Sequence, residues 1–415
     1  MAHFTPQLLI TLRQGYTLSA LRADMGAGLS VAIVALPLSI AIAIANGATP
    51  AQGLITAIIG GIIISALGGS RFQIGGPAGA FIVLISATVS AHGMEGLIIA
   101  TFMSGFVLVA MGVLRLGRLI RHIPHAVTVG FTGGIGIIIL ASEISPLLGL
   151  HLQAEPVPFA QKLAALWQAL GTLNPQAALL SAATVAGILT LRRLTPRAPV
   201  LLIIVVCGTL LALLAGLQVE TIESRFGGIP PAIPLPMLPE MTWDRAIAVL
   251  PAAVRFAILG AIASLLSAVV ADRLSGETHD PDTELIAQGA ANIAVALFGG
   301  FCVTGAVART ATNVRAAAHG PVSGIMHAAF LLAFVLLAAP LAGYVPLSVL
   351  AGVLVVVAAN MIERSQIAAF WAQDRAALIV FAVTLTLTLL HDLTEAIPAG
   401  VALSFILAAI RRRGS

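Results

Sequence analysis

The sequence predicts an all-α polytopic membrane protein whose fourteen transmembrane segments form two inverted repeats of seven. Hydrophobic residues make up 59% of the 415 residues and charged residues 9%, whereas a soluble domain carries about 25% charged residues. Apolar runs of about 20 residues, long enough to cross a bilayer, recur from end to end. Each half of the chain also contains one short segment that follows a glycine-rich break. These observations exclude a water-soluble protein.

The basic excess of the chain, 21 Lys and Arg against 17 Asp and Glu, does not indicate a nucleic-acid partner. The arginines lie in short loops between apolar runs, as membrane topology requires. Cys207 and Cys302 are far apart in apolar or glycine-rich surroundings, so no disulfide framework is predicted. We expect no cofactor and no metal site. The first helix, rather than a cleaved signal peptide, is expected to direct insertion.

The first half begins with a mildly amphipathic lead-in over residues 1–21. A polar connection contains an amphipathic stretch at Leu163–Leu170, with Trp167, which predicts a helix at the membrane interface. The five prolines and clustered acids of residues 218–244 predict an extracytoplasmic loop between the halves. The first seven segments are predicted at Met25–Ala45, Gln52–Leu67, Ala78–Ala91, Gly96–Leu114, Val127–Ala141, Gln176–Leu191 and Ala198–Leu217.

The second half repeats this plan and ends in the basic stretch 411–415. A count of fourteen segments places both termini on one side with most loop arginines, whereas Lys162, Arg225 and Arg245 fall opposite. Because basic loops face the cytoplasm, both termini are expected there, in a bacterial inner membrane. The last seven segments are predicted at Ala246–Ala271, Glu284–Leu297, Ala306–Ala318, Val322–Ala339, Val345–Ala359, Ala376–Leu390 and Thr394–Ile410.

The third segment of each half is short and follows an extended glycine-rich piece, Arg71–Pro77 or Gly300–Gly305. Seven is an odd number, so the two halves cross the membrane in opposite directions. Paired short segments at matching positions of inverted repeats are typical of a transporter substrate site. Because lipid does not tolerate bare extended backbone, we expect the pieces around Ile74 and Val303 to pair as short antiparallel strands.

Two half-helices that begin near the membrane midplane from opposite sides bring their N-termini face to face. Each N-terminus offers unpaired backbone N–H groups and about half a positive charge, which suits a small anion. Arg309 lies about one turn into the second half-helix, so its guanidinium is expected to reach the mouth of the site. The backbone positions predicted to bind the anion are Ala78, Gly79 and Ala80, and Ala306, Val307 and Ala308.

Three of the polar or glycine positions have a second interpretation. Arg309 alternatively serves as a structural residue that bonds the carbonyls at a helix C-terminus. Gly79 alternatively permits the close helix packing that small residues provide in membranes. His327, in apolar segment eleven, is interpreted as a core residue whose ring is satisfied, with a proton carrier as the alternative.

Several motifs together resemble a known transporter family. They are Leu21–Asp24 with Ala35–Pro37, Gly68–Gln73 with Gly76–Pro77, Gly130–Thr132, Glu284–Ile293, and Gly299–Gly300 with Thr304–Asn313. The chain resembles the sulfate permease (SulP-type) anion transporters, whose animal relatives include prestin and pendrin. The likeness covers almost the whole chain, from about Leu21 to Ile410, and its last two motifs are the most specific.

The resemblance implies the fold of uracil permease, in which a core domain moves against a gate domain and the anion sits between half-helices three and ten. The family usually ends in a cytoplasmic STAS domain, for which a chain that stops at Ser415 leaves no room. The implied division is a lead-in at 1–21, core parts at 22–115 and 245–340, gate parts at 116–217 and 341–410, the loop 218–244 and the end 411–415.

The resemblance also implies that segments one and eight line the anion cavity, here with Ser39, Ile42 and Ala263. Three positions depart from the family pattern. Leu38 stands where a polar residue is common, and Cys302 stands where a proline is common. Ala263 stands where many bacterial members carry a carboxylate, which weakens the expectation of sodium coupling, or of proton coupling through that acid.

The sequence therefore predicts a secondary active transporter of small anions. The leading substrates are a dicarboxylate such as fumarate, bicarbonate and sulfate, moved by proton-coupled symport or by exchange. The expected partners are the anion, the bilayer, protons where transport is coupled to them, and a second copy of the chain in a homodimer.

Four alternatives to a transporter of anions were weighed. A passive anion channel and a prestin-like motor or scaffold remain open on sequence alone. A nucleobase permease is disfavoured, because a neutral base needs buried carboxylates that neither Ala263 nor residues 304–313 supply. A membrane-embedded enzyme needs a nucleophile–base pair or a metal cluster within the segments, and the sequence offers none.

Overall fold

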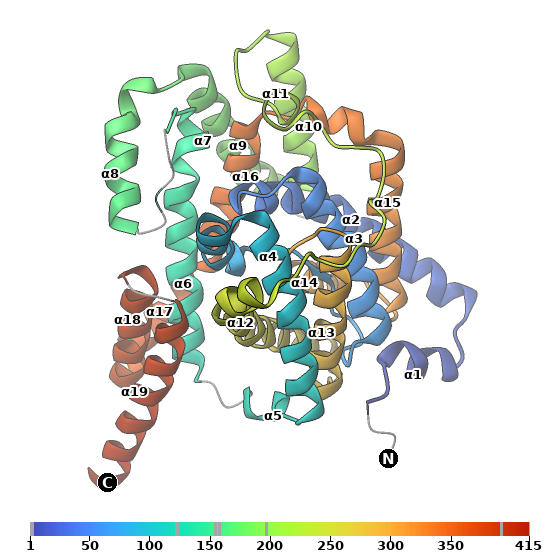
Figure 1. Cartoon of the computed structure of the whole chain (residues 1–415), viewed down its shortest axis with the longest axis vertical. Coiled ribbons are helices and arrows are strands. Elements are labelled where there is room, and N and C mark those ends of the chain that lie inside the picture. Colours follow the sequence, from blue (N-terminus) through green and yellow to red (C-terminus); the bar gives the residue numbers. More distant parts are fainter. Residues whose placement is uncertain are drawn as a thin grey trace.

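The structure, a computed structural model, describes residues 4–120, 124–152, 156, 159–195, 198–390 and 393–414. The described chain folds into a bundle of helices that contains one pair of very short strands (Figure 1). In the first half the elements are α1 (Gln7–Arg13), α2 (Leu18–Ala45), α3 (Pro50–Leu67), β1 (Gly75–Gly76), η1 (Gly79–Phe81), α4 (Ile82–Val113), α5 (Gly117–Ile120), α6 (His125–Ser142), α7 (Ile144–Leu148), α8 (Phe159–Ala169), η2 (Leu170–Thr172), α9 (Pro175–Leu194) and α10 (Val200–Leu214). In the second half they are α11 (Ile222–Phe226), α12 (Trp243–Ser275), α13 (Pro281–Leu297), β2 (Thr304–Gly305), α14 (Val307–Arg315), α15 (Val322–Gly343), α16 (Leu347–Met361), α17 (Arg364–Gln373), α18 (Arg375–Leu390) and α19 (Leu393–Gly414).

Every predicted segment corresponds to a helix, and the prediction of two seven-segment repeats is confirmed. The first repeat consists of α2, α3, α4, α6, α9 and α10, with α4 holding two segments. These two segments meet at Gly93, whose φ of 70° and ψ of −178° interrupt the helix. Glycine adopts this conformation at little cost because it has no Cβ. The second repeat consists of α12 to α16, α18 and α19.

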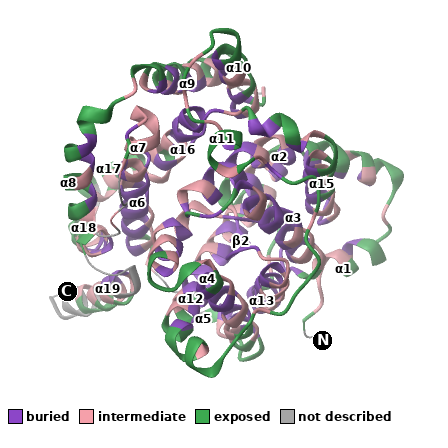
Figure 2. Ribbon diagram, turned by 45° about the horizontal axis from the view of Figure 1, so that its top comes forward, coloured by how far each residue is buried: buried purple, intermediate pink, exposed green. Residues whose placement is uncertain are grey.

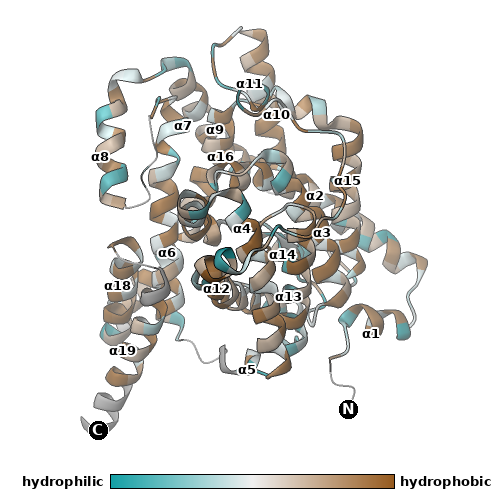
Figure 3. Ribbon diagram, in the orientation of Figure 1, coloured by the Kyte–Doolittle hydropathy of each residue, from teal (hydrophilic) through white to brown (hydrophobic). Residues whose placement is uncertain are grey.

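Eight of the described helical spans are long and apolar enough to cross a membrane. Three further apolar helices are shorter, among them α10 and α18. Hydrophobic residues cover the outward faces of helices such as α6, α15 and α18 (Figure 3). The ends of the described chain both lie at the lower end of the molecule in Figure 1, away from α11, as an even number of crossings requires.

Three tryptophans indicate where the membrane surfaces lie. The side chains of Trp167, Trp243 and Trp371 are 77%, 80% and 75% exposed. Tryptophan is enriched at membrane–water interfaces, where its ring is apolar and its N–H is hydrated. Trp167 lies on α8, so the predicted amphipathic helix at that point is confirmed. Trp371 lies on α17, a helix of ten residues between the predicted segments Val345–Ala359 and Ala376–Leu390.

Three of the membrane helices begin with the same local signal. Thr49, Asn174 and Asp280 each accept hydrogen bonds from the first backbone N–H groups of the helix that follows, and each precedes a proline. A short polar side chain satisfies N–H groups that have no partner within the helix. Proline fits the first helical position because its missing N–H is not needed there. The sequence therefore fixes where α3, α9 and α13 start.

Glycines allow the helices around the strands to approach closely. Gly105 of α4 and Gly289 of α13 face each other, and a Cβ built on either would lie 2.5–2.6 Å from the other's carbonyl oxygen. Small residues at such crossings let two helix backbones touch, which is how helices associate in membranes. The most buried residues lie where α3, α13 and β2 meet (Figure 2).

Replacing Gly289 with valine is expected to destabilise the protein by about 1–3 kcal/mol, because the new side chain must displace the α4 backbone. The measurement is thermal unfolding of the purified protein in detergent. Gly26→Ala is the matched control, since nothing lies within 4 Å of a Cβ at that position. An unchanged unfolding temperature for Gly289→Val would show that α4 and α13 do not need this close contact.

Candidate anion site between two half-helices

Two glycine-rich pieces from opposite halves of the chain cross at the centre of the structure. Strands β1 and β2 are antiparallel, with Gly75 opposite Gly305 and Gly76 opposite Thr304. All four residues are buried. Extended backbone at membrane depth must bond to other backbone, because lipid offers no donors or acceptors. The prediction that the two pieces pair as short antiparallel strands is confirmed.

Helix α12 fixes both strands from one side. The Thr304 hydroxyl donates a hydrogen bond to the Gly260 carbonyl at 3.0 Å. The side-chain amide of Gln73 donates to the Ser264 hydroxyl at 2.8 Å. Gly260 and Ser264 are four positions apart, so they lie on one face of the helix. One helix face therefore binds the chain on each side of the crossing.

The start of the second half-helix is joined to the first strand. The Ala306 N–H donates to the Ile74 carbonyl at 2.9 Å. In return the Ile74 N–H donates to the Thr310 hydroxyl at 3.1 Å, and that hydroxyl also bonds Ser267 of α12 at 2.9 Å. These bonds fix the first turn of α14 relative to β1. The two half-helices cannot shift independently without breaking them.

Two buried asparagines hold the extended pieces where they enter the crossing. The Asn292 side chain accepts from the Val303 N–H at 3.1 Å and donates to the Val303 carbonyl at 2.9 Å. The Asn313 amide donates to the Phe72 carbonyl at 2.9 Å. An amide side chain can replace a neighbouring strand because it offers both a donor and an acceptor. The strands therefore need only two residues each.

Each half-helix begins without a side-chain cap. Ala78 precedes η1 and α4, and Ala306 precedes α14, and neither side chain accepts a hydrogen bond. The first N–H groups of a helix have no partner within that helix, and its N-terminus carries about half a positive charge. Both starts therefore keep the properties that the sequence analysis predicted for an anion site.

The predicted contact residues differ in exposure. Ala78, Gly79, Ala80, Ala306 and Ala263 are partly buried, Ala308 is exposed, and the Val307 side chain is 43% exposed. The side chains of Ser39 and Ile42 are buried, at 0% and 3% exposure. The two helix starts and Ala263 are thus partly open, whereas Ser39 and Ile42 of α2 are covered.

Arg309 lies beneath the first half-helix and is fully buried. Its Nη2 donates to the Ser39 hydroxyl at 3.0 Å and approaches the Pro77 carbonyl at 3.5 Å. Its Nη1 packs on Gly76, where a Cβ would collide with it. Among the described residues, Nη1 and Nε have no hydrogen-bond partner and no carboxylate pairs with the guanidinium. The charge therefore lies beside the Pro77–Ala78 peptide and is not neutralised.

The carbonyl that Arg309 contacts, that of Pro77, precedes a helix start and does not end a helix, so the geometry differs from the predicted structural alternative. The unpaired Nε and Nη1 of Arg309 leave positive charge at the start of the first half-helix. The sequence placed the guanidinium at the mouth of the site, whereas the structure places it behind the chain that forms the mouth.

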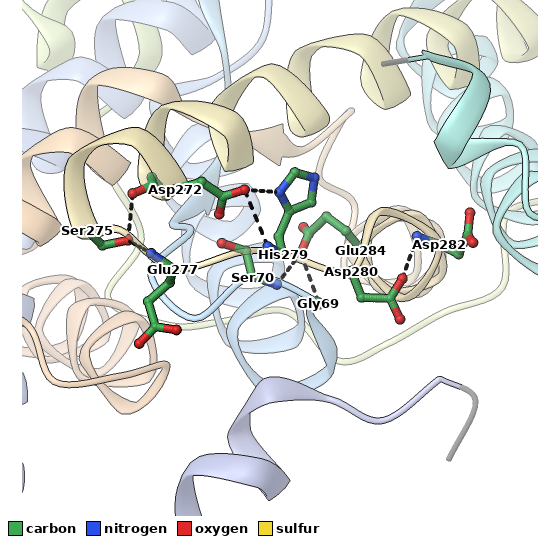
Figure 4. Close-up of polar contacts among 10 residues, drawn as sticks. Gly69, Ser70, Asp272, Ser275, Glu277, His279, Asp280, Asp282 and Glu284 are labelled. Atoms are coloured by element: carbon green, nitrogen blue, oxygen red, sulfur yellow. Dashed lines mark hydrogen bonds and ion pairs between the residues drawn. The ribbon is translucent and has the colours of Figure 1, made fainter. Parts of the chain in front are cut away.

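A buried glutamate holds the chain break that leads to β1. The Glu284 carboxylate accepts from the N–H groups of Gly69 and Ser70 at 3.0 and 3.1 Å (Figure 4). Its other oxygen accepts from the Gln288 amide at 3.0 Å and from the Ser264 hydroxyl at 3.4 Å. Four donors suit an ionised carboxylate in a buried site. Glu284 therefore joins the break after α3 to α12 and α13.

The sequence analysis quoted Glu284 within a motif and gave it no role. The sequence did contain an indication of this role. Burying an acidic residue at membrane depth costs free energy, so such a residue indicates a functional or structural requirement. Gln73 and Ser264 gave no such indication. They acquire their role only because residues 191 positions apart meet in the fold.

A cavity of about 620 Å³ lies beside the first half-helix. The first part of α4 and of α12 border it on one side, and α6, α8 and α18 border it on the other. Val83 and Leu84 line it, about one turn beyond Gly79. Gly79 itself faces Ile139 of α6 and Met361 of α16, which lie 3.5 and 3.8 Å from the position of a Cβ.

Inverted repeats that cross as short strands, with two opposed half-helices, define a membrane transporter of the inverted-repeat class. The chain belongs to the sulfate permease family, whose family description matches residues 21–384. It is 40% identical over 394 residues to the “Putative sulfate transporter YvdB” of Bacillus subtilis, covering 95% of this chain and 74% of that protein. It is 33% identical over 409 residues to the bicarbonate transporter BicA of Picosynechococcus, covering 94% of this chain and 70% of that protein.

Solved structures agree with this assignment. The transmembrane domain of a cyanobacterial bicarbonate transporter BicA matches with a TM-score of 0.83 and 31% identity, over 92% of this chain and 98% of that one. Murine Slc26a9, an anion transporter in an inward-facing state, matches with a TM-score of 0.85 and 16% identity, over 98% of this chain and 71% of that one. The second likeness supports the fold alone.

Replacing Glu284 with alanine is expected to destabilise the protein by about 3 kcal/mol, because two buried N–H groups lose their acceptor. Glu284→Gln retains one acceptor oxygen, so its stability is expected to lie between those of the wild type and Glu284→Ala. Thermal unfolding in detergent measures both variants. The control is Glu277→Ala, whose half-exposed pair with Arg71 contributes about 0–1 kcal/mol. Equal effects at positions 277 and 284 would contradict the role assigned to Glu284.

Proposed function

We propose that the protein is a secondary active transporter of small anions in a bacterial inner membrane. The observation that carries this proposal is the pair of uncapped half-helix starts at Ala78–Ala80 and Ala306–Ala308, with the unneutralised charge of Arg309 beside them. Helix N-termini bind anions through their N–H groups and their dipoles. The names of the relatives, which refer to sulfate and bicarbonate transport, agree with an anionic substrate.

The anion binds mainly to backbone groups in this proposal. Its ligands are the first N–H groups of the two half-helices, and Arg309 supplies long-range attraction. Ser39, Ile42 and Ala263 shape the cavity, with Ser39 orienting the guanidinium through its 3.0 Å bond. Backbone donors discriminate little between anions of similar size, so sulfate, bicarbonate and a dicarboxylate such as fumarate are all candidate substrates.

Transport proceeds by movement of a core domain against a gate domain. The core comprises residues 22–115 and 245–340, and the gate comprises residues 116–217 and 341–410. Packing supports this division, since α4 lies against α12 and α13, whereas α18 lies against α6 and α19. The 620 Å³ cavity is bordered by elements of both proposed domains, one turn from Gly79. Both termini face the cytoplasm in this proposal, as the arginine distribution indicates.

A passive anion channel and a nucleobase permease are the competing functions. A nucleobase permease is disfavoured because, among the described residues, no carboxylate borders the crossing; the nearby Glu284 is engaged by four donors. A channel conducts without saturation and without counterflow. A screen of radiolabelled sulfate, bicarbonate, fumarate and uracil in proteoliposomes, with counterflow measured for each, distinguishes the three.

Arg309→Ala is expected to reduce anion uptake into proteoliposomes at least tenfold, because the site loses its one full positive charge. Arg315→Ala on the same helix is the control, since that side chain is exposed at the last turn. Size-exclusion profiles establish that both variants fold. Unchanged uptake by a folded Arg309→Ala variant would remove Arg309 from the site.

Acidifying the external side is expected to stimulate uptake if protons accompany the anion. The test is uptake of labelled anion at external pH 6 and pH 8 with a constant internal pH. A flat response together with stimulation by internal anion would instead establish exchange. These two patterns separate the coupling modes that the proposed function leaves open.

A further inference from the structure

His327 is a fully buried histidine in the second turn of α15, within the proposed core domain. Helices α2 and α3 enclose it. A Cβ on Gly28 of α2 would lie 2.9 Å from the His327 backbone nitrogen, and a Cβ on Gly61 of α3 would lie 3.5 Å from the ring Nδ1. Gly28 lets the backbones of α2 and α15 pack closely, and Gly61 leaves room for the imidazole. The ring therefore lies on the side of α15 that faces α3.

Neither ring nitrogen of His327 has a hydrogen-bond partner among the described residues. The Gly324 carbonyl, about one turn earlier, is a close polar neighbour but does not meet hydrogen-bond geometry. The interpretation of His327 as a satisfied core residue is therefore wrong. A buried polar group without partners costs about 1–3 kcal/mol, so its presence in an apolar helix calls for a functional reason.

Arg309 is the charged side chain that lies across β1 from His327. The His327 Nδ1 and the Gly75 carbonyl oxygen both lie near the position that a Cβ on Gly61 would occupy, at 3.5 and 3.6 Å. The next residue of β1, Gly76, packs on the guanidinium of Arg309. Strand β1 thus lies between the histidine and the arginine. The imidazole faces the back of the same crossing whose front forms the anion site.

Within the described part of the chain, the other elements that pack on α15 bring no second charge close to the ring. Helix α2 carries Asp24 one turn from Gly28, and this carboxylate is engaged by the Tyr16 hydroxyl and by two backbone N–H groups. The face that α3 presents carries Gly61 and the uncharged Ser65. Helix α11 brings Glu223 to Gly343, sixteen positions and about 24 Å along α15.

We propose that His327 is the proton-binding residue that couples proton movement to anion movement. This inference rests on the proposed anion site. While Arg309 is unpaired, a second positive charge nearby is unfavourable, and His327 stays neutral. An anion at the half-helix starts offsets the charge of Arg309, and the ring nitrogen then accepts one proton. Anion and proton leave together, so each favours the binding of the other.

The variant that tests this is His327→Gln, which keeps a polar side chain of similar length and cannot titrate near neutral pH. The control is His151→Gln, because His151 is exposed and lies far along the chain. Proteoliposomes carry a pH-sensitive dye and receive labelled sulfate or fumarate, whichever the wild-type protein exchanges. Two readouts are taken: counterflow without a pH gradient, and accumulation driven by a gradient of two pH units.

We expect His327→Gln to retain counterflow within threefold of the wild type and to lose at least tenfold in pH-driven accumulation, with no acidification of the lumen. Wild-type pH dependence in this variant overturns the proposal. If the wild-type protein shows counterflow but its accumulation of anion does not respond to the pH gradient, the proposed role of His327 is overturned and the proposed anion transport stands. Absence of wild-type counterflow for every anion overturns the proposed function itself.

A measurement on the wild-type protein covers the case in which His327→Gln does not fold. Sulfate or fumarate is added to the detergent-solubilised protein in weak buffer, and a pH indicator records proton uptake. The coupling predicts about one proton bound per anion near neutral pH, and at least tenfold less proton uptake by the Arg309→Ala variant at the same anion concentration, because that variant binds the anion more weakly. Anion binding by the wild type without proton uptake overturns the proposal.

Discussion

The pairing of two glycine-rich backbones inside the membrane is the constraint on which the rest of the structure depends. Neither β1 nor β2 has a partner within its own repeat, so each must find hydrogen bonds in the other. Their pairing brings two helix starts to one place. The side chains of Gln73, Asn292, Thr304 and Asn313 then satisfy the backbone that two-residue strands leave unpaired. The proposed anion site follows from this solution to a problem of backbone hydrogen bonding.

The two buried charged residues at the crossing, Glu284 and Arg309, differ in their hydrogen bonding. Both are fully buried. Glu284 accepts from four donors, as a structural charge must. Arg309 retains two nitrogens without partners, and His327 behind it retains two more. Glu284 thus serves to hold the backbone in place, whereas the unsatisfied nitrogens of Arg309 lie beside the place where the substrate is proposed to bind.

Much of this arrangement was predictable because it follows from local rules. Each span must be apolar, so the fourteen segments could be located, and the break at Gly300–Gly305 required a backbone partner that only Arg71–Pro77 offered. The position of the Arg309 head could not be predicted. It depends on Ser39, 270 positions away, and on the absence of a side chain at Gly76. The contacts of Glu284 with Gly69 likewise join residues 215 positions apart. Helix α17 was not predicted, because its ten residues are too few to span a membrane.

The lack of side-chain caps at the two half-helix starts has an evolutionary consequence. A backbone N–H group persists through every substitution except one to proline, so mutation at Ala78 or Ala306 changes the walls of the site and leaves its donors in place. In the proposed site, side chains around the crossing can therefore change while the backbone donors for the anion stay. Relatives that share this scaffold and are named for different anions are the outcome expected of such a site.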